Sequence, residues 1–220
     1  MYLSRLILNP RSRRVQKDIA VPKEMHRTVL SGFPDEMNKV MDKEAERVLF
    51  RLEQSPQSGL ISLLVQSTLQ PDWSRLPDER YLLLGSDLPS AIQQNPAIKE
   101  VSYALNQGQL LSFRLRANPT KRLSAGKGNK GKRIGLYRMD EQQEWLVRKA
   151  EDAGFRIHSA LPNGQNFVDG RKDDDLKFFS VQFDGVLQVT EPDKFTAAIQ
   201  NGIGSGKAFG FGLLSVAPIR

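Results

Sequence analysis

The chain has 220 residues with 32 Lys or Arg against 25 Asp or Glu, a formal net charge of +7 that favours a polyanionic partner, nucleic acid before membrane. Its length suits one large domain or two small ones, and 39% apolar residues with two Trp exclude an intrinsically disordered chain. The absence of Cys excludes disulfides, thiolate zinc sites and cysteine nucleophiles, and no apolar run is long enough for a signal peptide or a membrane span, so we expect a soluble cytoplasmic protein.

The first half of the chain predicts the element order β-α-β-β-α-β. Residues 2–8 alternate apolar and polar side chains as a strand does, whereas the basic stretch NPRSRRVQKDIAVP predicts a loop, closed by Pro22 at the start of a short helix, KEMHRTVL. The later elements are strands at 47–53 and 60–67 around the turn QSPQSG, a weak helix at 89–94, and a strand in GQLLSFRLRANP with Leu111, Phe113 and Leu115 on one face. This is the order of a ferredoxin-like domain.

The second half predicts a comparable order, without any residue-level repeat. A helix at 141–153 has Asp140 as its predicted N-cap and Gly154 after its end. Its predicted core side chains are Trp145, Leu146 and Ala150. The other elements are strands at 133–138, 155–158, 176–189 and 213–216, the third bending or turning at Asp184–Gly185, and a helix in EPDKFTAAIQNG stopped by Gly202. The sequence therefore predicts an α+β fold of tandem ferredoxin-like (RRM-like) domains, at residues 1–120 and 121–220.

The strongest change of composition lies between the two halves, where no Asp or Glu occurs from Val101 to Met139. The centre of this stretch, KRLSAGKGNKGKR, contains three glycines and predicts a mobile loop. An exposed linker is the ordinary interpretation, but charge of one sign over so long a stretch favours an anionic partner. The predicted phosphate contacts are Lys121, Arg122, Lys127, Lys130, Lys132 and Arg133, together with Arg11, Arg13 and Arg14 after the first strand.

Five of the 17 glycines stand in one stretch near the carboxyl end, NGIGSGKAFGFGLLSV. A Walker-type phosphate loop is excluded, because its first glycine would fall on Asn201 and its Ser or Thr on Ala208. Closely spaced glycines still let backbone N–H groups approach a phosphate, whereas a tight turn between helix and strand needs only one or two of them. The predicted phosphate contacts in this stretch are Gly202, Gly204, Gly206, Lys207, Gly210 and Gly212.

The same glycines carry a resemblance to a known family. Gly202-Ile-Gly204, five residues, then Gly210-Phe-Gly212 resembles the G-φ-G-x5-G-φ-G signature of CRISPR-associated repeat-processing endoribonucleases, in the RAMP superfamily. With NPRSR, EMHRT, FRLRANPTKR and FDGVLQVTEPDKF in family order, the whole chain is similar to the CasE family of subtype I-E systems. The resemblance implies two ferredoxin-like domains, recognition of a repeat hairpin in precursor CRISPR RNA, one metal-independent cut, and retention of the product in the Cascade surveillance complex.

The residues offer one clear candidate for such chemistry. Histidine is the side chain best suited to acid or base work near neutral pH, and the chain contains only His26, in EMHRT, and His158, which we expect to be a structural or surface strand residue. CasE-like enzymes carry their essential histidine in the motif of His26. Lys23 would stabilise charge on the phosphorane and Arg27 would clamp a phosphate oxygen, although both could simply be solvated helix residues. In relatives the position of Lys23 can hold a tyrosine.

The expected partners are a CRISPR repeat stem-loop and other Cascade subunits, with no membrane contact, and the free protein is expected to be a monomer. No cofactor and no metal ion are predicted; the run Asp173–Asp175 matches no metal-binding loop and predicts a solvated turn. The alternative is a non-catalytic subunit that binds RNA or scaffolds a ribonucleoprotein complex. The residues leave open the repeat sequence that is recognised and whether His26 acts as acid or as base.

Overall fold

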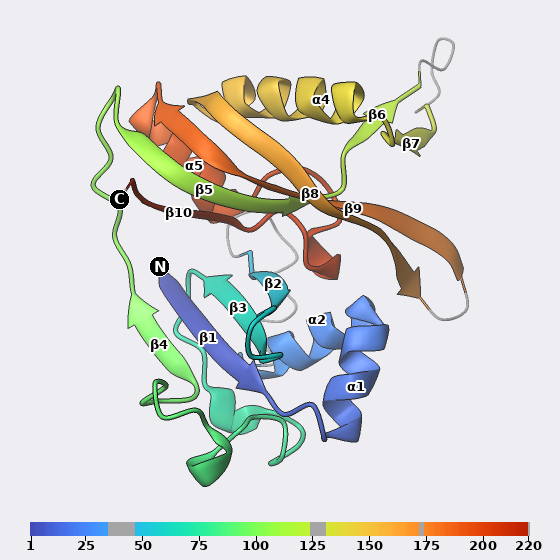
Figure 1. Cartoon of the computed structure of the whole chain (residues 1–220), viewed down its shortest axis with the longest axis vertical. Coiled ribbons are helices and arrows are strands. Elements are labelled where there is room, and N and C mark those ends of the chain that lie inside the picture. The colour runs from blue at the N-terminus through green and yellow to red at the C-terminus, as the bar shows by residue number, and fades with distance from the viewer. Residues whose placement is uncertain (35–46, 124–130, 172–173, 220) are drawn as a thin grey trace. The chain divides into compact units, whose positions relative to one another are not determined.

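The computed structural model describes residues 1–34, 47–123, 131–171 and 174–219 (Figure 1). The chain divides into two compact units. Unit 1 comprises Met1–Tyr103, Asp169–Asp175 and Ala208–Gly210, and unit 2 comprises Ala104–Val168, Leu176–Lys207 and Phe211–Arg220. The polypeptide therefore returns to unit 1 twice after it has entered unit 2.

Unit 1 contains a four-stranded antiparallel sheet in the order β2-β3-β1-β4 (Figure 1). Its strands are β1 (Tyr2–Leu8), β2 (Leu49–Gln54), β3 (Ile61–Ser67) and β4 (Ala97–Glu100). The central strand β1 pairs on one side with β3, where Tyr2 lies opposite Ser67, and on the other with β4, where Tyr2 lies opposite Glu100. Alternate residues, among them Leu6 and Leu63, enter a core that also takes Val15 and Met25 from two helices.

The two helices of unit 1 are α1 (Arg13–Ala20) and α2 (Pro22–Ser31). Helix α2 begins as predicted at Pro22, whose missing N–H costs nothing at the first helical position. The loop predicted over the basic stretch is wrong, because α1 forms there. Ser12 caps α1 through a hydrogen bond that its Oγ accepts from the Val15 N–H at 3.3 Å, and burial of Val15 anchors the helix on the sheet.

The segment between β3 and β4 does not contain the helix predicted at 89–94. Two short 3₁₀ turns, η1 (Trp73–Arg75) and η2 (Gly85–Asp87), and irregular backbone stand in its place. The Asn95 side chain holds this segment against β1, since its Oδ1 accepts from the Ile7 N–H and its Nδ2 donates to the carbonyls of Ile7 and Leu83, each at 2.8 Å. Unit 1 still has the ferredoxin-like strand order, because its fourth strand is β4, which the sequence does not predict and which pairs with β1.

Unit 2 repeats this type of sheet, with the strand order β10-β5-β9-β8. The strands are β5 (Leu110–Ala117), β8 (Phe155–Arg171), β9 (Asp174–Val189) and β10 (Leu214–Pro218), and the helices are α4 (Met139–Asp152) and α5 (Pro192–Asn201). Trp145 of α4 stacks on Phe183 of β9 at 6.3 Å between ring centroids, and Phe195 of α5 lies 5.1 Å from Phe155, so both helices pack on the sheet. The predicted α+β class with tandem ferredoxin-like domains is confirmed.

Several predicted details of unit 2 need correction. The expected border at residue 120 would place β5 in the first domain, whereas this strand pairs with β9 and β10 and lies in unit 2. The strand predicted at 133–138 is only β7 (Arg133–Gly135), which forms a hairpin with β6 (Thr120–Arg122). Strand β9 does not turn at Asp184–Gly185, since its pairing with β5 continues through both residues.

The predicted carboxyl-terminal end of α4 is confirmed, but its predicted N-cap is wrong. Gly154 follows the helix with φ +76°, as predicted. At the other end the N-cap is Arg138, not Asp140, which lies inside the first turn and accepts two hydrogen bonds from the Arg138 guanidinium. A carboxylate is still favourable there, because the first turn of a helix carries partial positive charge.

Candidate active site and nucleic-acid interface

Helix α2 carries the three predicted catalytic residues, Lys23, His26 and Arg27. Met25, Thr28 and Val29 are buried and fix the helix on the core. Lys23 and His26, one turn apart, remain partly exposed, and Arg27 is exposed. Lys23 makes no side-chain hydrogen bond or ion pair to any other described residue, so its ammonium group is available to an added phosphate.

The ring of His26 rests on a buried phenyl ring. Its centroid lies 6.0 Å from that of Phe50 on β2, with 21° between the ring planes. Phe50 is only 2% exposed. On the same phenyl ring lies Gly210, where an added Cβ would come within 3.1 Å of Phe50 Cε2. The structure thus brings the histidine and part of the glycine-rich stretch to one residue of unit 1.

Glu24 links the two helices of unit 1 through several cations. Its carboxylate pairs with Arg27, with Lys17 at 3.2 Å and with Arg14 at 3.9 Å. The hydrogen bond from Lys17 and the charges of Arg27 and Arg14 hold the pKa of Glu24 below its usual value, against the opposing effect of burial. Arg27 is therefore engaged through one nitrogen, Nη1, and Glu24 offsets part of the charge that its guanidinium could offer to a phosphate.

Arg14, a predicted phosphate contact, already bonds to other residues of the protein. Its guanidinium lies 3.0 Å from Asp18 Oδ1 and donates a hydrogen bond to Thr28 Oγ1 at 2.7 Å. Asp18 is buried and also accepts a hydrogen bond from the Tyr81 hydroxyl at 2.9 Å. Burial, with the adjacent carboxylate, raises the pKa of Tyr81 above its ordinary value.

Two other predicted contacts lie at the start of α1. Arg11 and Arg13 are exposed, and neither side chain bonds to another residue in the described part of the chain. They are the freer members of the predicted trio, because Arg14 serves the packing of α1 on α2.

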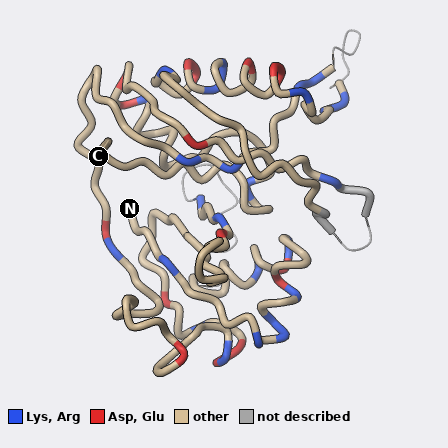
Figure 2. Tube along the Cα trace, viewed as in Figure 1, with Lys and Arg blue, Asp and Glu red and all other residues tan. Residues whose placement is uncertain are grey.

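Four of the six basic residues predicted mid-chain lie on or beside the hairpin β6–β7 (Figure 2). Lys121, Arg122, Lys132 and Arg133 lie on or beside it and are exposed. Arg122 and Arg133 stand directly opposite each other, a pairing that is unfavourable until an anion neutralises it. Lys121 is instead paired with Glu141 at 2.8 Å. Lys127 and Lys130 lie outside the described residues.

The five glycines of the carboxyl-terminal stretch all have positive φ, from +71° at Gly202 to +89° at Gly212. Four of them also face the protein itself. An added Cβ would lie 2.8 Å from the carbonyl oxygen of Ile203 at Gly212, and between 2.9 and 3.1 Å from Phe211, Trp145 and Phe50 at Gly206, Gly204 and Gly210. The packing of the chain on itself gives a reason for glycine at these positions, and contact with phosphate through them stays a prediction. Lys207, partly buried, opens the turn η3 (Lys207–Phe209).

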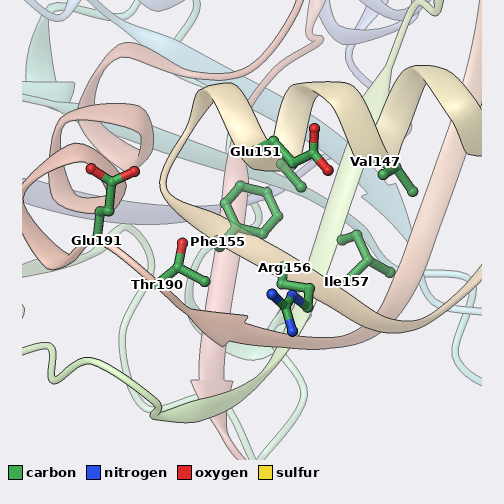
Figure 3. A pocket seen from close by; sticks show the side chains of 8 residues that line it. Val147, Glu151, Phe155, Arg156, Ile157, Thr190 and Glu191 are labelled. Atoms are coloured by element: carbon green, nitrogen blue, oxygen red, sulfur yellow. The ribbon is translucent and has the colours of Figure 1, made fainter.

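The other features of the surface do not coincide with the predicted residues. His158 is exposed on β8, with Nε2 3.5 Å from Gln188 Oε1. A cavity of about 280 Å³ lies between α4, β8 and the start of α5, lined by Val147, Arg156, Thr190 and their neighbours (Figure 3). In the described ranges no cluster of three or more His, Asp or Glu is arranged to hold a metal ion, and no helix there is both long and apolar enough to span a bilayer.

Sequence reasoning missed Phe50 and Glu24. Glu24 could have been noticed, since it stands one turn before Thr28 and three residues before Arg27 on the same helix. Phe50 carries no local signal, because an aromatic residue in a buried strand is common and the contact with His26 joins positions far apart in the sequence.

Comparison with known proteins supplies independent findings. The family model described as "CRISPR associated protein" matches residues 1–218. A CRISPR-associated endoribonuclease Cse3 from Thermus thermophilus is 39% identical, covering 99% of this chain and all of its own length. The CRISPR system Cascade subunit CasE from Escherichia coli is 30% identical over the full length of both chains. A solved structure of the endoribonuclease Cse3 bound to a 19-nucleotide RNA superposes with a TM-score of 0.83, at 38% identity, over 99% of this chain and all of that one.

Proposed function

Because the chain belongs to the CRISPR-associated CasE/Cse3 family, we propose that it is an endoribonuclease that binds the repeat hairpin of precursor CRISPR RNA, cuts once at the base of the stem and retains the product in Cascade. The observation that carries the proposal is a partly exposed imidazole, that of His26, seated on the buried ring of Phe50 and accompanied on α2 by Lys23 and Arg27. Pure binding gives no reason for a histidine in this position.

The proposed reaction uses the ribose itself as nucleophile. The 2′-OH loses its proton and its oxygen attacks the adjacent phosphorus in line, while the bond from phosphorus to the 5′-oxygen breaks and that oxygen is protonated. The products are a 2′,3′-cyclic phosphate and a 5′-OH, with no net redox change and no metal ion in any step. His26 serves as the acid or the base of this exchange.

The cations of α2 would act on the charge that develops at phosphorus. Lys23, with no partner among the described residues, would stabilise the phosphorane as a point charge. Arg27 would offer its planar fork to a phosphate oxygen, although its Nη1 is already paired with Glu24, which offsets part of its charge. We therefore expect Lys23 to contribute more to the rate than Arg27.

The hairpin β6–β7 would hold the RNA stem. A-form RNA hides the base edges of its deep groove, so a protein reads a stem through its shape and its phosphates. Arg122 and Arg133 present a concentrated positive charge suited to that task. The exposed Arg11 and Arg13 add two phosphate contacts at the start of α1.

Incubation of the full-length protein with end-labelled repeat RNA in excess EDTA tests the proposal. One cut is expected, with a product whose 3′ phosphate resists phosphatase until acid opens the ring. An RNA with a single 2′-deoxy substitution at the cut should bind and stay intact. His26→Ala should abolish cleavage and keep the affinity, whereas the control His158→Ala should cut normally. Retarded but intact RNA with the wild-type protein would favour the non-catalytic binding subunit.

A further inference from the structure

Unit 2 carries a cluster of exposed aromatic rings that the proposed function does not use. Among the exposed large apolar side chains of the described residues, the two aromatic ones are Tyr137 and Phe167, exposed by 57% and 63%. Their ring centroids lie 5.9 Å apart, and each also contacts Phe179, at 5.0 and 5.1 Å. We call these three residues the aromatic triad. Exposed rings that cluster in this way leave apolar faces in water, which marks a binding surface.

Two residues of the triad, Tyr137 and Phe179, are held in place by contacts with the backbone and with neighbouring residues. An added Cβ at Gly135 would lie 2.9 Å from the Tyr137 ring, so the ring rests directly on the backbone of β7. The N–H of Leu136 donates to the Pro119 carbonyl at 3.0 Å, and the Leu136 carbonyl accepts from Gln142. Asn118 Oδ1 accepts the Phe179 N–H at 3.2 Å. Rings fixed before binding lose little conformational freedom when a ligand stacks on them.

The triad also adjoins the most basic element of the chain. Tyr137 follows β7 by two residues, and Phe179 is tied through Asn118 to the end of β5, just before β6. Both connections lead to the hairpin that bears Arg122 and Arg133. A ligand that suits this place must present a flat π-face beside a phosphate, which is the chemistry of a nucleotide.

We infer that the aromatic triad is a stacking site for an unpaired nucleobase of the RNA held by the hairpin β6–β7. This inference rests on the proposed function, because it assumes that RNA is the ligand. The base would lie on the outer faces of Tyr137 and Phe167, while the backbone phosphates next to it meet the arginines of the hairpin. A paired base inside a stem hides both faces in its own stack, so the occupant is a nucleotide outside the stem, in its loop or its flanks.

A docking surface for another protein is the competing interpretation. An apolar segment of a partner would bury the same rings, but it would gain nothing from the opposed arginines of the adjoining hairpin. Charge complementarity therefore favours the nucleotide, and the two occupants differ in what the triad does to RNA affinity.

The first experiment replaces the two exposed rings in the full-length protein. The double variant Tyr137→Leu, Phe167→Leu keeps apolar volume and removes the π-faces. It should weaken binding of the repeat RNA roughly 5- to 100-fold, without changing the slope of log affinity against log salt, because no phosphate contact is lost. Leu110→Ala, which removes an exposed apolar side chain at the opposite end of β5, should bind as the wild type does.

A fluorescence measurement checks the contact directly. The two native tryptophans, Trp73 and Trp145, are only 5% and 2% exposed, so bound RNA should not reach them. A change of emission in the Tyr137→Trp variant therefore reports on the added tryptophan. Its emission should be quenched when repeat RNA binds, and that of Leu110→Trp should not. The quenching should vanish with a fully paired RNA duplex that has neither loop nor flanks.

The outcomes separate this inference from the proposed function. Wild-type protein that neither binds nor cuts repeat RNA overturns both. If the wild type cuts, the double variant binds with equal affinity and RNA leaves the emission of the Tyr137→Trp variant unchanged, the stacking site is refuted and the nuclease stands. Normal RNA affinity combined with loss of co-purifying Cascade subunits would also refute it, and would assign the triad to a protein partner.

Discussion

The imidazole of His26 and the phenyl ring of Phe50 lie nearly parallel, 21° apart in plane and 6.0 Å between centroids. His26 belongs to α2 and Phe50 to the buried first half of β2. The phenyl ring thereby limits the directions in which the imidazole can point, since one face of the histidine is closed by a side chain that the core holds still.

Phe50→Leu should therefore slow cleavage more than it weakens binding. Loss of the flat support lets the imidazole drift, and a misplacement of about 1 Å is enough to cost a rate roughly 10- to 100-fold. We expect kcat for repeat RNA to fall by that amount, with KM nearly unchanged. Phe33→Leu is the matched control, because Phe33 is equally buried in unit 1 and contacts Trp73 rather than His26. Equal losses in both variants would assign Phe50 to stability alone.

Arg122→Gln combined with Arg133→Gln should reduce the salt dependence of RNA binding. Each cation that meets a phosphate contributes a slope of about 0.7 to 0.9, so the double variant should lose about 1 to 2 units of slope along with affinity. Filter binding between roughly 50 and 300 mM salt checks this. Arg148→Gln with Arg156→Gln removes the same charge from exposed positions elsewhere in unit 2 and serves as the control. An identical slope in wild type and hairpin variant would contradict the contact.

Gly212→Ala should destabilise the fold more than Gly108→Ala. Both glycines have a similar positive φ, +89° and +84°, a conformation that costs an alanine about 1 to 2 kcal/mol. An added Cβ meets nothing within 4 Å at Gly108 but comes within 2.8 Å of the Ile203 carbonyl oxygen at Gly212. That clash should add about 1 to 3 kcal/mol, measured as the free energy of unfolding in urea. Similar losses at the two positions would show that backbone conformation alone requires the glycines.

Glu24→Gln should lower stability at neutral pH and have no effect in acid. The folded pKa of Glu24 lies below its usual value of 4.5, so its contribution is fully present above pH 4.5 and is lost as the pH falls through the folded value. The loss should be about 1 kcal/mol or less, because its cationic partners are partly exposed and screened. Urea unfolding at several pH values checks it, with Glu144→Gln, an exposed residue of α4, as control. A loss independent of pH would contradict the ionic explanation.

The elements that the sequence predicts well are those with a local signal. Pro22 and Gly202 mark a helix start and a helix end by backbone geometry alone, and both are confirmed. Helix α1 is not predicted, because its many basic residues are typical of a loop. Ser12 as N-cap, with Val15 and Ile19 one turn apart, is nevertheless a helical pattern. Strand β4 could not be found, since its four residues are mostly exposed and pair with β1 from a great distance along the chain.

The sequence likewise predicts some residues of the candidate site and not others. His26 is identified by its rarity and its motif, because the chain has only two histidines. The engagement of Arg14 with Asp18 and Thr28 could not be read from the sequence, since it depends on how α1 crosses α2. The surplus glycines have no visible reason within the sequence other than phosphate, because the neighbours that crowd them come from α4, from β2 and from the turn itself.

The passage of residues 208–210 into the amino-terminal unit has a consequence for dissecting this protein. A truncated polypeptide that stops at Tyr103 would contain the histidine and its phenyl support yet lack Gly210, and so would leave uncovered the side of Phe50 on which that glycine sits. A gene cut after Tyr103 would therefore separate unit 1 from three of its own residues, Ala208–Gly210, and we expect such a fragment to hold the ring of Phe50, and with it His26, less firmly than the whole chain does.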